Sequence, residues 1–426
     1  MTKSPLTEEI ANGRYDGVFT TLYGGESPAF HQKRWTELIT RHQERVGDAS
    51  PRLFSAPGRT ELSGNHTDHN HGKVLAASVQ LDTIAAVTLL DEPVAEVVSQ
   101  GYPAVRINLS SLDKDKNEEG KTESLLRGIA AGIVARKGAI GGFTATTTSR
   151  VLKGSGLSSS AALEILVGAI MNELFNDGQF SAVDLALIGQ EAENQFFGKP
   201  CGLLDQCACS IGGAVEIDFA NPANPQITPL QANFAAEGYA LAVVDTGGDH
   251  ANLTPDYAAI PGEMKAIAAS LGAEVLNDAK EEEFRSSIGQ LRKEHGERAV
   301  LRALHFYSEN HRVDAMAAAL RNNEMSNYLK GVRSSGHSSL SSLQNIFSPA
   351  HPEHQGISLA LTLTEEFLQG DGAVRVHGGG FAGTIQAYIP AQRMKEYQDL
   401  MEPVFGEGSV VPLFIRPLPA GELHPL

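Results

Sequence analysis

The chain has 426 residues, of which 42% are hydrophobic and 20% are charged, an ordinary composition for a globular protein. Because a single hydrophobic core stops growing at about 250–300 residues, this length predicts two domains. The formal net charge of −17 argues against nucleic acid or an anionic membrane surface as a partner.

Two further features predict a cytoplasmic protein. The first ten residues, MTKSPLTEEI, lack the apolar core of a signal peptide, and no run of about 18 apolar residues predicts a membrane span. The three cysteines, Cys201, Cys207 and Cys209, are odd in number and do not have a usual zinc spacing. We therefore expect reduced thiols that serve as small core residues.

The predicted elements of the first third of the chain are helices followed by strands. Residues 1–50 are mostly helical and polar, and residues 51–110 alternate turns with short apolar runs such as KVLAASV and TIAAVTLL, which predict strands. The charged stretch 110–124 predicts an exposed loop. An apolar helix follows over 125–138 and ends at a glycine.

The middle of the chain predicts a strand and two helices. The β-branched residues of TATTTSRVL (144–152) favour a strand, and the nearly all-apolar run 161–175 favours a buried helix. A second helix is predicted over 180–198, because Ser181 and Asp184 have the spacing of a capping box.

The last part of the chain predicts a helical region and then a second group of strands. Residues 258–345 are mainly helical by periodicity, and VRVHGGGFAGTIQAYIP (374–390) predicts a strand, a glycine turn and another apolar segment. The Pro/Asn-rich run FANPANPQITP interrupts the pattern near 215–240. We place the domain division there, giving domains 1–225 and 226–426.

The stretch KGSGLSSSAA (153–162) lies between the predicted strand and the buried helix. Gly154 and Gly156 let the backbone approach a ligand closely, and the helix start offers free N–H groups and a positive dipole end. These features predict a phosphate cradle. The stretch also contains three hydroxyl groups that can bind phosphate oxygen or a magnesium ion, those of Ser158, Ser159 and Ser160.

Three common nucleotide sites do not fit this stretch. The chain contains no Walker motif G-x-x-x-x-G-K-[ST]. The third glycine of a dinucleotide loop, G-x-G-x-x-G, is Ser159 here, which disfavours a dinucleotide-dependent oxidoreductase. The H-R-D catalytic loop of protein kinases is also missing from the sequence.

The stretch does resemble the second motif of the GHMP kinases, G-L-[GS]-S-S-A. SAPGRTELSGNHTDHNHG (55–72) resembles the galactokinase signature A-P-G-R-x-N-[LIV]-I-G-E-H-x-D-Y-N-x-G, and VHGGGFAGTIQA (376–387) resembles the third motif, G-G-G-F-G-G. QEAENQFFGKPCGLLDQCA (190–208) resembles the galactokinase run with the magnesium glutamate and the catalytic aspartate. The motifs occur in the family's order over roughly residues 18–416.

This resemblance implies the α+β, two-domain GHMP kinase fold. The first domain would be like ribosomal protein S5 domain 2 and the second ferredoxin-like, with nucleotide and sugar in the cleft between them. The implied activity is phosphorylation of the anomeric hydroxyl of galactose by ATP with Mg²⁺. The implied partners are a small-molecule sugar and MgATP, and the oligomeric state stays open, a monomer included.

The resemblance also implies the catalytic residues. Asp205 matches the aspartate of C-G-[IL]-[LM]-D-Q, and Arg59 matches the arginine of A-P-G-R, which would lie nearby and keep the aspartate ionised. Ser160 and Glu193 match the magnesium ligands. The positions that match the ATP loop are Gly154, Ser155, Gly156, Leu157, Ser158, Ser159 and Ser160.

The sugar side carries the departures from the family pattern. Asn65 stands where the family has glutamate, Glu61 where it has asparagine, Ser63 where it has isoleucine and His69 where it has tyrosine. The exact sugar therefore stays open: another hexose or an N-acetylhexosamine is an alternative, and so is a galactokinase-like sensor without turnover. The positions that match sugar-binding residues are Asn65, His66, Asp68, Gly202 and Tyr257.

A different interpretation of the same segment is a transition-metal cluster formed by its histidines and aspartate. His66, Asp68, His69 and His71 lie close together in sequence, but none of the histidines has a partner four residues away along a predicted helix. The surrounding kinase motif favours sugar hydroxyls as the ligands, since carboxylate and imidazole groups form directional hydrogen bonds to them.

Overall fold

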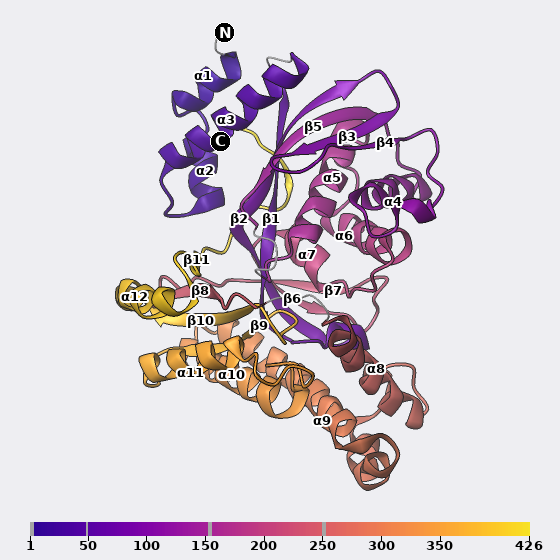
Figure 1. Cartoon of the computed structure of the whole chain (residues 1–426), viewed down its shortest axis with the longest axis vertical. Coiled ribbons are helices and arrows are strands. Elements are labelled where there is room, and N and C mark those ends of the chain that lie inside the picture. Colours follow the sequence, from indigo (N-terminus) through magenta and orange to yellow (C-terminus); the bar gives the residue numbers. More distant parts are fainter. Residues whose placement is uncertain (1–3, 48–49, 152–155, 249–252) are drawn as a thin grey trace.

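The computed structural model of the chain describes residues 4–47, 50–151, 156–248 and 253–426, and Figure 1 shows how they are arranged around two sheets. The first sheet has the order β12-β1-β2-β5-β3-β4, with β6 paired to β2 and β7 to β6. Its strands are β1 (Arg52–Ser63), β2 (Lys73–Leu90), β3 (Val94–Ser99), β4 (Val105–Asn108), β5 (Gly142–Ser149), β6 (Ala214–Asp218), β7 (Gln226–Leu230) and β12 (Gly421–Glu422).

Strand β2 is the longest strand of this sheet and pairs with three other strands. The two apolar runs expected as separate strands form one strand of 18 residues, most of it buried. One edge of β2 pairs with β1, while the other edge pairs with β6 near its start and with β5 near its end. Burial on both faces explains why the two runs are apolar at consecutive positions, because helices pack against the sheet from both sides (Figure 1).

The helices of the first half of the chain follow the predicted pattern. Helices α1–α3 pack on one side of the sheet and α4–α7 on the other (Figure 1). Helix α6 begins with the predicted capping box of Ser181 and Asp184, but it ends early and continues as a π-helix, η3 (Ala192–Phe197). The helices are α1 (Pro5–Ala11), α2 (Asp16–Tyr23), α3 (Pro28–Val46), α4 (Thr122–Ala135), α5 (Ser159–Phe175), α6 (Ala182–Glu191) and α7 (Leu204–Ile211).

The second sheet is antiparallel, with the order β11-β8-β10-β9. Its apolar residues form a core with α11 and α12. Its strands are β8 (Tyr239–Asp245), β9 (Ala373–His377), β10 (Thr384–Pro390) and β11 (Val410–Leu413). The helices of this half are α8 (Thr254–Ser270), α9 (Glu281–Arg321), α10 (Met325–Ser338), α11 (Gly356–Leu368) and α12 (Met394–Phe405).

The α+β class is confirmed, and the cysteines are free, with Cys207 and Cys209 buried. Strands β7 and β12 lie in the second half of the chain but pair into the first sheet. The pairing of β12 with β1 brings the C-terminal end of the chain to the helices α1–α3 (Figure 1). Among the described residues, no helix is both long and apolar enough to cross a membrane.

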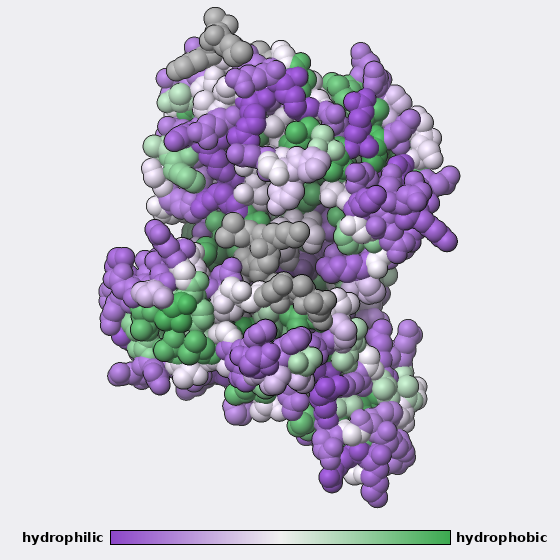
Figure 2. Space-filling model, viewed as in Figure 1, coloured by the Kyte–Doolittle hydropathy of each residue, from purple (hydrophilic) through white to green (hydrophobic). Residues whose placement is uncertain are grey.

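The surface in Figure 2 is mainly hydrophilic, as the charge of the chain predicts. A hydrophobic area lies over α11 and α12, where Leu359, Leu400 and Val404 are exposed.

Candidate active site

Asp205 lies in the first turn of α7, where the helix dipole favours a negative charge. Its Oδ1 accepts from Nε and Nη2 of Arg59, both at 2.7 Å, and its Oδ2 accepts from the Ser158 hydroxyl. The structure therefore brings together two residues that are 146 positions apart in the sequence. The Arg59 side chain is 8% exposed and that of Asp205 39%, so a small molecule can approach the carboxylate more easily than the guanidinium.

These contacts decide the charge of the carboxylate. Burial alone would raise the pKa of Asp205, but the Arg59 charge and the hydrogen bonds from Ser158 and Arg59, with the more distant charge of Lys199, lower it below its usual value. Asp205 is therefore ionised at neutral pH and can accept a proton from a hydroxyl placed beside it.

The turn before α5 is tied to the same arginine. Gly156 and the N-cap residue Ser158 both have positive φ, 68° and 60°, which gives the turn its tight path. The backbone N–H of Arg59 donates to Leu157 O at 3.0 Å, and its Nη1 donates to Gly156 O. Leu157 is buried, whereas Ser158, Ser159 and Ser160 are partly exposed. The other two predicted ATP residues, Gly154 and Ser155, lie outside the described residues.

The predicted sugar-side residues meet the glycine turn that follows β9. Asn65 Nδ2, His66 Nε2 and the Tyr257 hydroxyl contact the three consecutive carbonyl oxygens of residues 378–380, at 2.6, 2.9 and 2.9 Å. A carbonyl only accepts, so His66 carries its proton on Nε2. Burial, followed by the His69 charge, lowers the pKa of His66 to about 3, so the imidazole is neutral.

Asp68 and Gly202 are also in contact. A Cβ added at Gly202 would lie 1.8 Å from Asp68 Oδ2, so only glycine leaves room for this carboxylate. Because Gly202 precedes Asp205 by three residues, this contact places the segment 64–68 next to the chain that carries Asp205. Asn65 differs from Asp68 in being 1% exposed, with its amide hydrogen-bonded to protein groups.

A second group of carboxylates surrounds Gln206, the residue after Asp205. Gln206 Nε2 donates to Glu193 Oε2 and to Glu164 Oε2, each at 3.0 Å. Glu193 Oε1 also pairs with Lys199 Nζ at 3.0 Å. The π-helix η3 carries Glu193, which is 4% exposed, so this residue is not the surface charge that an amphipathic helix would present.

Glu164 is a residue that the motif comparison missed. Burial and then the Glu193 charge raise the pKa of Glu164 to about 8, and its Oε1 is buried without a hydrogen-bond partner among the described residues. It follows Ser160 by four residues on α5, so the two side chains lie on one face of that helix. The available signal was a glutamate flanked on both sides by apolar residues, in the run AALEILV of that helix.

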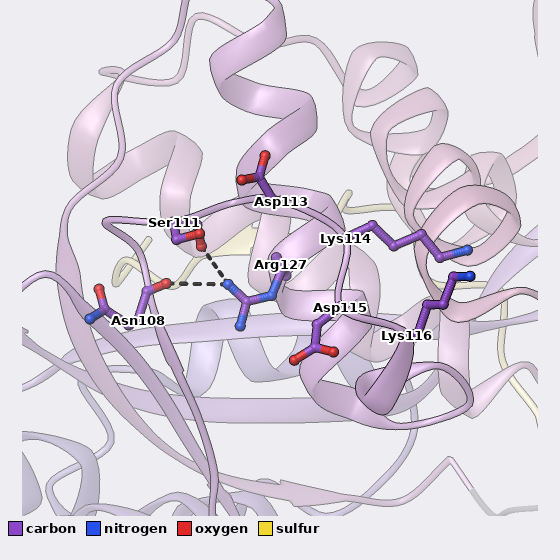
Figure 3. Close-up of a pocket in the computed structure, with 7 residues that line it drawn as sticks. All are labelled: Asn108, Ser111, Asp113, Lys114, Asp115, Lys116 and Arg127. Atoms are coloured by element: carbon purple, nitrogen blue, oxygen red, sulfur yellow. Dashed lines mark hydrogen bonds between the residues drawn. The ribbon is translucent and has the colours of Figure 1, made fainter.

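The charged loop predicted at 110–124 forms a polar hollow near the π-helix η3, which carries Glu193. Figure 3 shows Arg127 directed at the backbone carbonyls of Asn108 and Ser111. Gly120 N donates to Phe197 O at 3.0 Å, which joins the loop to the end of η3. The hollow is lined by Asn108, Ser111, Asp113, Lys114, Asp115, Lys116 and Arg127.

Known protein families match the same segments of the chain that carry the site residues. The galactokinase galactose-binding signature matches residues 40–89, and the GHMP kinases N terminal domain matches residues 124–213. The galactokinase of Glaesserella parasuis serovar 5 (strain SH0165) is 30% identical over 367 residues, which are 85% of this chain and 91% of that protein.

Solved structures show the same fold. Lactococcus lactis galactokinase, crystallised in complex with galactose, superimposes with a TM-score of 0.76 at 22% identity, covering 92% of this chain and 100% of the other. The mevalonate kinase of Methanococcus jannaschii superimposes with a TM-score of 0.60 at 14% identity over 86% of this chain and 98% of the other. The fold is therefore that of the GHMP kinases, and the extent of the sequence match shows that the chain belongs to the galactokinase family of sugar kinases.

Proposed function

We propose that this chain transfers the γ-phosphoryl group of ATP to the anomeric hydroxyl of galactose, giving galactose 1-phosphate and ADP. The observation that carries the proposal is the Arg59–Asp205–Ser158 contact, which joins an ionised carboxylate to the turn before α5. The relatives named above are galactokinases, and the solved one was crystallised with galactose. We further propose that the protein works in the cytoplasm and that its domains divide near residue 225.

In this proposal Asp205 accepts or orients the proton of the attacking hydroxyl. Ser158 and Arg59 each hold one oxygen of the carboxylate, which limits its rotation and aligns it for the proton. Arg59 is buried and positively charged, so it also stabilises negative charge that develops on the phosphoryl group.

The phosphates of ATP would lie over the start of α5. Backbone N–H groups of residues 156–160 and the first-turn hydroxyls suit phosphate oxygens, and Gly154 and Ser155 complete the matched loop. The residues beside it suit Mg²⁺, because Ser160 and Glu193 carry oxygen ligands and Glu164 Oε1 has no hydrogen-bond partner in the part of the chain that the structure describes. When bound, Mg²⁺ neutralises phosphate charge. We assign Ser160 and Glu193 as its ligands, with Glu164 beside them.

The sugar would lie against the segment 64–68 and the glycine turn. Asp68 and Gly202 meet beside the chain that leads to Asp205, so we assign Asp68 to a sugar hydroxyl and Gly202 to the close approach of the sugar. His66 and Tyr257 donate hydrogen bonds to the turn at 378–380, so we assign both of them to the sugar side. Asn65 completes the assignment, with its amide oriented by neighbouring protein groups.

The experiment is a coupled ADP-release assay with MgATP against galactose, N-acetylgalactosamine, glucose, mannose and no sugar. We expect turnover with galactose well above the other sugars. A higher kcat/KM for another sugar would show that this sugar, and not galactose, is the substrate. If calorimetry detects binding of ATP and sugar but no ADP is released, the protein is a sugar sensor and not an enzyme.

A further inference from the structure

Glu61 and Asn65 form a buried pair at the end of β1. Glu61 is 5% exposed and Asn65 1%. Asn65 Nδ2 lies 3.1 and 3.3 Å from the two carboxylate oxygens of Glu61, and Arg375 Nη2 from strand β9 donates to Glu61 Oε1 at 2.5 Å. The carboxylate therefore bridges an amide on the sugar-side segment and a guanidinium of the second sheet.

The partners of Asn65 fix which way its amide points. Nδ2 donates to Glu61 and to Gly378 O, while Oδ1 accepts from Asn345 Nδ2 at 2.7 Å. A reversed amide would put its oxygen against a carboxylate and a carbonyl, both of which only accept. Glu61 thus holds the amide in one orientation and leaves a single lone pair of its oxygen for any further donor.

The pair also reverses the order in the galactokinase signature, where asparagine stands at position 61 and glutamate at position 65. The two departures were separate observations in the sequence, and the structure shows that they are one contact. Because both residue types are kept and only their positions are exchanged, the carboxylate and the amide act together.

We propose that Glu61 and Arg375 are positioning residues for the sugar, which act by orienting Asn65 and holding the segment 64–68 against the 378–380 turn. This inference rests on the proposed function, because it concerns the sugar side of the same site. His66 directly follows Asn65 and Asp68 lies three residues later, so a shift of Asn65 moves both of them.

The buried charges predict that a single change at Glu61 or Asn65 disturbs this part of the site. Arg375 is fully buried, and its Nε and Nη1 have no hydrogen-bond partner among the described residues, so Glu61 is the anion that compensates its charge. Asn65→Glu would put a second carboxylate at about 3 Å from the first, and like charges at that distance oppose each other.

The test is a cycle of Asn65→Glu, Glu61→Asn and the double exchange Glu61→Asn/Asn65→Glu. We expect each single variant to raise the sugar KM by about tenfold or more, because residues in direct contact are coupled, with the KM for ATP and kcat changed far less. The double exchange should recover most of this loss. Asn224→Glu, at an exposed turn, adds the same charge as a control and should change neither KM.

Effects of the single changes that simply add up in the double exchange would overturn the proposal, as would an unchanged sugar KM in both single variants. If a single variant does not fold, Glu61→Gln, which keeps the shape and removes the charge, takes its place in the same cycle. The melting temperatures without ligand give an independent readout of the coupling. A wild type that phosphorylates no sugar would refute the proposed function, whereas additive melting temperatures would refute the pair.

Discussion

At the scale of single residues, the contacts of Asp205 fix both the position and the charge of its carboxylate, as a general base requires. Burial opposes its charge, and one arginine and one serine, both from other segments, more than offset that opposition. The carboxylate is therefore fixed, ionised and still partly open to a ligand.

Asp205→Asn removes the proton acceptor but keeps the shape of the side chain. We expect kcat to fall by about 10²–10⁴-fold, the usual contribution of a general base, while the Kd for ATP stays within a few-fold. The ADP-release assay measures the first quantity and calorimetry the second. A kcat close to that of the wild type would remove Asp205 from the mechanism.

Gly202→Ala tests the contact with Asp68. The added Cβ would meet Asp68 Oδ2 at 1.8 Å, so the carboxylate must move. We expect a higher KM for the sugar, with little change in the KM for ATP. Gly262→Ala on α8 is the matched control, because its Cβ would meet nothing within 4 Å. Equal sugar KM values for the two variants would argue against a sugar role for Asp68.

The sequence predicted only those site residues that lie within short motifs. Arg59 and Asp205 were assigned from their motifs, and their contact was expected. Glu164 was missed, because nothing in an apolar helix shows that its carboxylate will meet Gln206 from α7. The Glu61–Arg375 pair was also missed, since the two residues are 314 positions apart and only the assembled sheets bring them together.

At the scale of elements, local sequence predicted the helices up to α6, the helical region of α8–α10 and the strands β9 and β10, whereas α7, α11, α12, β6–β8, β11 and β12 had no separate prediction. The capping box at Ser181 and the glycine turn before β10 appear where expected, because each depends on a few neighbouring residues. Two predicted elements differ in length or type by more than a few residues at one end. The residues between the two apolar runs continue β2, because β1 pairs along both runs and, between them, Gln80 N donates to Phe414 O while Ser78 O accepts from Arg416 N. Helix α6 changes into the π-helix that carries Glu193.

Ser181→Ala tests how much the capping box stabilises α6 and the η3 segment behind it. The Ser181 hydroxyl accepts from Asp184 N at 3.2 Å, and Asp184 Oδ2 accepts from Ser181 N at 2.9 Å. We expect the variant to lose about 1 kcal/mol of unfolding free energy in urea denaturation, with Ser181→Thr close to the wild type. A loss as large for threonine as for alanine would contradict the capping role.

At the scale of the whole molecule, one buried aspartate joins both ends of the chain to the first sheet. Asp82 on β2 is fully buried and accepts from Arg34 Nη1 at 2.5 Å, from Tyr23 at 2.9 Å and from Ser55 at 2.6 Å, with Arg416 at 3.5 Å. Such long-range contacts could not be predicted from composition or periodicity. They explain why the N-terminal helices and the C-terminal segment pack on the same sheet.

Asp82→Asn would leave two buried guanidinium groups without their anion. We expect a loss of about 3–5 kcal/mol of unfolding free energy, the usual effect of breaking a buried ion pair. Asp399→Asn, at an exposed pair on α12, is the control and should change stability by less than about 1 kcal/mol. Similar melting temperatures for the two variants would contradict the role of Asp82.

The pH dependence of that loss has a definite sign. Burial raises the pKa of Asp82, but the charges of Arg34 and Arg416 and the hydrogen bonds lower it below its usual value in the folded state. The stabilisation is therefore complete above the unfolded pKa, about 3.9, and is lost as pH falls through the lower folded pKa. The stability difference between wild type and Asp82→Asn should shrink below about pH 4. A constant difference down to pH 2.5 would contradict it.

The most direct measurement of the central claim is the identity of the product. Phosphorus NMR of a reaction with MgATP and galactose should show ADP and a sugar phosphate in equal amounts, with the phosphorus coupled to the anomeric proton. The same reaction with the Asp205→Asn variant should form both products at least about 100-fold more slowly. ADP formed with inorganic phosphate alone, or phosphorus coupled to any other sugar proton, would contradict the account.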